Sequence, residues 1–193
     1  MRKPWSMPLS LLLAACCTAG GLVGCSEHTG LGPTPAYEGC ATDENWVTFD
    51  DYITTARVKT DAASSPTWVE PTSPAALSSA SAPSLRFQPA PSMPGSANGD
   101  ASCPQFTPQR RAGITPLHLP PVSGTTFDVH FAVDGADVFR VLTTRQSTSV
   151  PLALWKGWAG KRVTVTLYSA RLLKNEVAEG PFRAAPLEIN VSP

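Results

Sequence analysis

The C-terminal part of the chain carries a regular alternation of apolar and polar side chains. Between residues 127 and 133 every second position is Phe or Val, and the positions between them include Asp128 and His130. This two-residue period predicts a β-strand with one buried face and one solvated face. The dipeptide Asp134-Gly135 that follows is a hairpin signal. Further strands are predicted at 138–142, 163–168 and 187–191.

A less regular stretch precedes these strands. Residues 62–102 are mostly Ala, Ser, Pro and Gly, a composition typical of a disordered linker. Two islands within it, 66–71 and 83–89, carry alternating apolar residues between prolines, which suits edge strands. Short strands separated by turn signals predict an all-β sandwich over residues 66–193, with a long proline-rich loop insertion at about 90–122.

Further upstream the hydrophobic period lengthens from two residues to three and four. Apolar side chains recur at this spacing between residues 46 and 56, acidic residues occupy the first turn, and Thr42 or Asp43 suits the N-cap. The pattern predicts one short helix, docked on the sandwich through Trp46 and Phe49. We assign it to an N-terminal segment, residues 42–65.

The first 24 residues have the layout of a secretory signal, with a basic start and an apolar run between residues 9 and 23. The run ends in Leu22-Val23-Gly24-Cys25, which resembles the lipobox of bacterial lipoproteins. This resemblance implies cleavage after Gly24 and acylation of Cys25. Two alternatives stay open. One is a transmembrane anchor, although about 15 apolar residues fall short of the roughly 20 that a spanning helix needs; the other is an ordinary signal-peptidase site.

The residues after Cys25 bear on where the protein lies. Residues 25–41 are polar, contain Gly and Pro and show no period, which predicts a flexible lipidated tether. Ser26 stands where the best-known sorting rule for inner-membrane lipoproteins has Asp. The resemblance therefore favours the outer membrane, with the membrane itself as a partner through the lipid on Cys25.

The remaining cysteines suggest a disulfide. Cys16 and Cys17 would leave with the signal, which leaves Cys40 and Cys103 in a compartment that oxidises thiols. We expect these two to pair, and closing a loop of about 60 residues is worth roughly 4 kcal/mol in the chain-entropy model. A two-cysteine metal site is the alternative, but it needs further ligands, and no histidine has such spacing.

The order of the predicted strands resembles an immunoglobulin-like or fibronectin type III-like domain of bacterial extracytoplasmic proteins. The resemblance covers about residues 66–193 and includes Trp155 before the turn into the penultimate strand. The insertion at about 90–122 departs from the usual pattern. The resemblance implies a fold and not a function, because such sandwiches serve many unrelated roles.

Charge excludes one class of partner and predicts one internal contact. With 15 basic and 15 acidic side chains, the chain lacks the positive footprint of a nucleic-acid binder. Acidic residues predominate in 26–105 and basic residues in 106–193. We therefore expect the acidic N-terminal segment to lie across the basic sandwich, held by the Cys40–Cys103 bridge.

No sequence motif points to catalysis, a cofactor or a metal. The chain has no Gly-x-Ser-x-Gly, His-Glu-x-x-His or Cys-x-x-Cys motif. His28 lies in the tether, His118 lies among prolines and leucines, and His130 is expected on a solvated face. The acidic pairs Asp43-Glu44 and Asp50-Asp51 are interpreted as helix-terminal or solvated charges.

Two pairs of residues are candidates for a binding surface. Trp155 and Trp158 could stack on a sugar or meet a protein partner, or they could fill the core and cap the turn. Arg110 and Arg111 could meet an anionic partner, or they could be solvated.

The expected function is that of a lipid-anchored cell-envelope protein with a non-catalytic binding or scaffolding role toward an envelope protein or glycan. The alternative is an extracytoplasmic carbohydrate-binding accessory domain or hydrolase.

Overall fold

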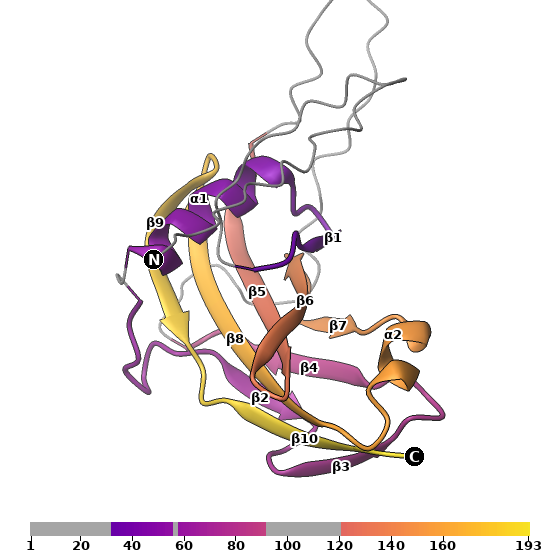
Figure 1. The fold of residues 1–193 in the computed structure, drawn as a ribbon. Helices are drawn as coiled ribbons and strands as arrows, with labels where there is room; N and C mark the ends of the chain where they lie inside the picture. The colour runs from indigo at the N-terminus through magenta and orange to yellow at the C-terminus, as the bar shows by residue number, and fades with distance from the viewer. Residues whose placement is uncertain (1–31, 56–57, 92–120) are drawn as a thin grey trace, which may run out of the picture.

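The computed structural model describes residues 32–55, 58–91 and 121–193 (Figure 1). The segment expected to be a signal peptide lies outside the described residues, as do Cys25, Cys103, Arg110 and Arg111. In chain order the elements are β1 (Ala36–Glu38), α1 (Asp43–Thr54), β2 (Thr67–Glu70), β3 (Ala75–Ser78), β4 (Ser84–Gln88), β5 (Gly124–Val133), β6 (Ala136–Thr143), β7 (Ser147–Ser149), α2 (Leu152–Gly157), β8 (Arg162–Leu173), β9 (Glu176–Arg183) and β10 (Leu187–Ser192). Within the described part of the chain, no helix has the length and apolar character needed to cross a membrane.

The strands form two sheets. The larger has seven strands in the order β1-β6-β5-β8-β10-β3, with β9 also paired to β8, and the smaller has the order β2-β4-β7. The 12-residue β8 is long enough to pair with β10 along its first half and with β9 along its second half. Together the two sheets confirm the all-β sandwich that the alternation predicts.

The main core lies between the two sheets. Phe127, Val129 and Phe131 of β5 are at most 1% exposed, and the ring of Phe127 packs 4.8 Å from the ring of Phe87 on β4. The alternate apolar positions of β8 and β10 join the same cluster, as does Trp155 of α2. The period of two thus places one face of each strand in this core.

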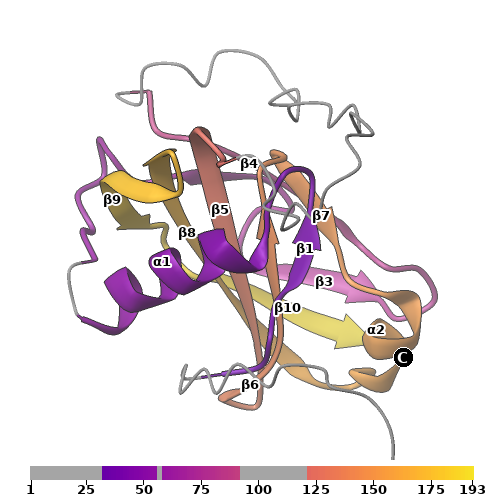
Figure 2. The same cartoon turned by 90° about the horizontal axis from the view of Figure 1, so that it is seen from above.

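The opposite face of the large sheet is covered by α1, which runs across its strands (Figure 2). Phe49 is fully buried there against Leu142 of β6 and Ala170 of β8, and Ile53 packs against the same cluster. The predicted helix and its docking through Phe49 are therefore confirmed, while nothing is described of the Trp46 side chain. The expectation of a solvated second face on β5 is wrong at Asp128, which is fully buried.

Four strands were not predicted. β1 pairs in parallel with β6, β3 pairs in parallel with β10, β7 pairs antiparallel with β4, and β9 forms a hairpin with β8. Because β1 falls at residues 36–38, the predicted flexible tether is too long at its C-terminal end. Gly39 then turns the chain with φ +67°, and the backbone N–H of Cys40 donates to Thr144 Oγ1 at 2.9 Å.

Candidate functional site

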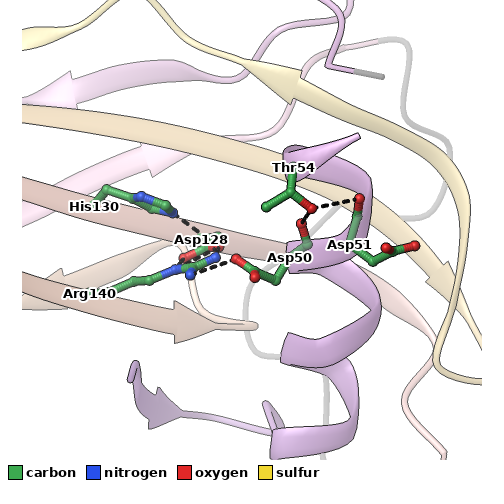
Figure 3. Close-up of polar contacts among 6 residues, drawn as sticks. All are labelled: Asp50, Asp51, Thr54, Asp128, His130 and Arg140. Atoms are coloured by element: carbon green, nitrogen blue, oxygen red, sulfur yellow. Dashed lines mark hydrogen bonds and ion pairs between the residues drawn. The ribbon is translucent and has the colours of Figure 1, made fainter. Parts of the chain in front are cut away.

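A cluster of charged side chains lies between α1 and the large sheet (Figure 3). Asp128 comes from β5, Arg140 from the returning strand β6, and Asp50 from the middle of α1. The hairpin register pairs His130 with Arg140, which brings Asp128, two residues earlier, diagonally opposite Arg140 on the same face. The helix therefore brings Asp50 to three hairpin residues, Asp128, His130 and Arg140, that are far from it in sequence.

Arg140 links the sheet to the helix. Its Nε donates to both carboxylate oxygens of Asp128, at 2.9 and 3.1 Å, and its Nη2 donates to Asp128 Oδ2. Its Nη1 donates to Asp50 Oδ1 at 2.8 Å. The planar guanidinium has donors facing in both directions, so one side chain can bridge two carboxylates.

Burial makes these pairs energetically important. The side chains of Asp128 and Arg140 are 0% and 1% exposed, and that of Asp50 is 14% exposed. A buried charge is costly unless it is paired with an opposite charge and hydrogen-bonded. The hydrogen bonds between Arg140 and the two carboxylates meet both conditions. Asp50 was interpreted as a solvated charge, and that interpretation is wrong because its carboxylate turns toward Arg140. The adjacent Asp51 is exposed and lies on another side of the helix.

His130 lies next to Asp128 and completes the cluster. Its Nε2 lies 3.2 Å from Asp128 Oδ2, an ion-pair distance without the alignment of a hydrogen bond, and its ring lies 5.1 Å from that of Tyr168 on β8. The His130 side chain is only 13% exposed. The expectation of a solvated histidine is therefore also wrong.

The surroundings set the ionisation of two of these groups. Burial by itself raises the pKa of Asp128, but the charge interaction with His130 and the hydrogen bonds from Arg140 outweigh burial and lower this pKa to about 2. Burial raises the pKa of Tyr168, and the neighbouring Arg183 guanidinium opposes that rise. Asp128 is thus held as a carboxylate at any ordinary pH.

The lowered pKa of Asp128 predicts a loss of stability in acid. The folded-state pKa lies below the ordinary value of 3.8, so its stabilisation is present above about pH 4 and disappears as the pH falls through 2. The difference corresponds to about 2 kcal/mol. Carboxyl-carbon NMR of the folded protein should show Asp128 still ionised at pH 3, with the urea-unfolded chain as reference. A folded-state midpoint near the unfolded one would contradict the expectation.

Chemically, this cluster is suited to holding the helix on the sheet. The charges of Asp128, Arg140 and Asp50 are directed at one another, and α1 covers them. Within residues 32–55, 58–91 and 121–193, no group of three or more His, Cys, Asp or Glu is arranged to hold a metal ion. We therefore describe the cluster as an ionic latch, formed by Asp50, Asp128, His130 and Arg140.

The tryptophans considered as a binding surface lie in the core. Trp155 is 0% exposed and Trp158 is 7% exposed, and their rings lie 5.8 Å apart, edge to face. Trp155 Nε1 donates to the carbonyl of Ser78 at 3.0 Å, which satisfies its polar edge inside the protein. The surface interpretation is wrong for both residues because α2 turns them between the sheets.

Sequence reasoning missed the ionic latch, although a signal for it is present. Asp128 and Arg140 flank the Asp134-Gly135 turn, so a hairpin centred on that turn places both near one another. Asp50 adds a contact of the kind expected between an acidic N-terminal segment and a basic sandwich.

Cys40 is described but Cys103 is not, so their pairing stays a prediction. No protein-family model, curated protein sequence or solved structure matches the chain.

Proposed function

We propose that the chain is a lipid-anchored protein of the bacterial cell envelope whose sandwich binds or scaffolds another envelope component without catalysis. The observation that carries the proposal is the sequence Leu22-Val23-Gly24-Cys25 at the end of a basic and then apolar leader. Two or more acyl chains give stable anchoring, at about 0.8 kcal/mol per buried methylene. Ser26 favours the outer membrane, and the partner is an envelope protein or a glycan.

In this proposal the sandwich is of the immunoglobulin-like or fibronectin type III-like kind. Support comes from the succession of strands over residues 66–193 and from the buried Trp155 that precedes β8. Domains of this kind present edges and loops to partners while the two-sheet core stays rigid. A binding role therefore requires no opening of the core.

A non-catalytic role is supported by how the charged side chains are used. The four members of the ionic latch interact with one another where α1 packs on the large sheet. The alternative of a carbohydrate-binding domain drew its support from exposed tryptophans, and Trp155 and Trp158 are buried. Scaffolding is therefore the role that the described residues favour.

Replacement of Cys25 tests the anchor. Cys25→Ser should abolish palmitate labelling and move the protein from the membrane fraction to the soluble fraction, since the thiol is the site of acylation. Cys17→Ser is the matched control and should keep both the label and the membrane fraction. Unchanged labelling of Cys25→Ser would sink the proposal. Co-purification of the tagged, lipidated protein from intact envelopes would then identify its partner.

We also propose that Cys40 and Cys103 form a disulfide. Cys40 follows β1 and is fixed to Thr144 through its backbone N–H, so a bridge there would join the long insertion to the start of the fold. Cys40→Ser and Cys103→Ser should each lower the free energy of unfolding by about 4 kcal/mol, and the double variant by no more than either single one. Mass spectrometry that finds both thiols free in the oxidised protein would contradict the bridge.

A further inference from the structure

An open pocket lies beside the ionic latch, at the C-terminal end of α1. Its volume is about 290 Å³, and it is lined by Ile53, Val58, Thr60, Tyr168 and Arg183. For comparison, a cavity of about 150 Å³ accommodates benzene. The pocket can therefore hold an aromatic ring or a short aliphatic chain together with a polar head group.

Backbone pairing fixes the residues that form this pocket. The N–H of Lys59 donates to the carbonyl of Pro181, and the N–H of Arg183 donates to the carbonyl of Lys59, both at 2.9 Å. Residues 58–60 thus lie along β9 like a further short strand, with a parallel bridge between Lys59 and Phe182. Because side chains alternate along such a segment, Val58 and Thr60 share the side of the pocket. Lys59 points the other way, with its ammonium 5.4 Å from the Phe182 ring centroid.

The polar groups of the pocket favour an anion. Arg183 is exposed and makes no ion pair with a carboxylate of the described residues. Arg183 lies beside Tyr168 in the lining of the pocket. The Tyr168 hydroxyl can donate a hydrogen bond from the same lining. One pocket therefore presents a charged donor and a hydroxyl donor together.

The C-terminal end of α1, beside the pocket, repels an anion less than most helix C-termini do. A helix C-terminus carries partial negative charge on its last carbonyls. Here the hydroxyl of Thr54 donates to the carbonyls of Asp50 and Asp51, and the hydroxyl of Thr55 donates to those of Asp51 and Tyr52, at 2.8–3.3 Å. These hydrogen bonds reduce the partial negative charge at the C-terminal end of α1, where Ile53 lines the pocket.

We propose that this pocket binds a small organic carboxylate with an apolar body. The carboxylate accepts hydrogen bonds from Arg183 and from the Tyr168 hydroxyl, and the apolar body packs on Ile53 and Val58. Such a site combines a mainly apolar lining with a few convergent polar groups, as small-molecule sites usually do. This inference goes beyond the proposed scaffolding role and rests on none of the evidence for the lipid anchor.

Benzoate and benzamide make a matched pair of probes, equal in size and different in charge. In NMR titrations of the full chain, benzoate should bind saturably and shift the Nε–H resonance of Arg183, and benzamide should bind at least tenfold more weakly. Arg183→Gln should weaken benzoate binding at least tenfold, and Tyr168→Phe several-fold. Arg171→Gln on β8 is the control with the same change of charge, and it should leave the affinity unchanged.

The carboxylate could belong to a free acid or to the end of a peptide chain. To distinguish the two, the affinity of acetyl-Ala-Ala-Leu is measured as the free acid and as the amide. Tighter binding of the peptide acid than of benzoate assigns the site to chain ends, and weaker or equal binding assigns it to free acids. The proposal is overturned if neither benzoate nor the peptide acid binds saturably by about 10 mM, a concentration that corresponds to a very weak complex. Affinity that Arg183→Gln leaves unchanged overturns it as well.

Discussion

Replacing Arg140 with methionine is expected to lower the free energy of unfolding by about 3–5 kcal/mol, the largest effect of any single charged residue described. Methionine fills much of the same space, but it leaves Asp128 fully buried without its main hydrogen-bond donor and removes the contact to Asp50. Removing one partner of a buried pair exposes the full cost of burying the other charge. Urea unfolding followed by circular dichroism measures the difference.

Two further variants separate burial from loss of charge. Arg86→Met makes the same substitution in the exposed pair of Arg86 with Glu70, whose side chains are 58% and 63% exposed, and should cost less than about 1 kcal/mol. Adding Asp128→Leu to Arg140→Met should restore part of the loss, because it removes the orphaned carboxylate. If Arg140→Met and Arg86→Met cost the same, the ionic latch contributes no more than a surface pair.

Trp155→Ala is expected to destabilise the fold by about 3–5 kcal/mol, through a cavity in the core between the sheets. The indole is fully buried, contacts Trp158 and satisfies the carbonyl of Ser78. Alanine removes the packing and leaves that carbonyl without its donor. Thermal and urea unfolding of the variant provide the measurement.

The neighbouring helix residue Leu154 offers the control. Its side chain is 42% exposed, so Leu154→Ala should cost well under 1 kcal/mol in the same short helix. Trp155→Phe should fall between the two, since it keeps most of the ring packing and loses the hydrogen bond to Ser78. Equal losses for Trp155→Ala and Leu154→Ala would show that the core does not depend on the indole.

The strands that could be predicted from the sequence are those whose alternation extends over several residues. β5, β6, β8 and β10 have one apolar face, and β2 and β4 have an alternating apolar pair between prolines. β1, β3 and β7 are only three or four residues long, too short to show a period. β9 contains Gly180-Pro181, a pair that normally indicates the end of a strand. Their pairing is decided by neighbours distant in the chain.

The site shows a different limit. A period of two indicates that β5 has two faces, but it cannot say what covers the second face. The apolar side chains at a spacing of three and four likewise predict that Phe49 faces the sandwich, but they do not say which strands it contacts. The contact between Asp50 and Arg140 depends on where the helix crosses the sheet, and neither the strand pattern nor the helix pattern alone specifies that crossing. Tertiary placement of this kind is not encoded in a local pattern.

The charged character of the contact between α1 and the sheet bears on how the protein fluctuates. The main core lies wholly on the other side of the large sheet, so the helix can detach as a separate cooperative unit while the sandwich persists. Water would hydrate Asp50, Asp128 and Arg140 in the detached state, whereas a purely apolar contact would leave only hydrophobic surface exposed. We therefore expect amides of α1 to exchange with deuterium well before those of β5 and β8. Added salt, which screens charges once water reaches them, should speed that exchange.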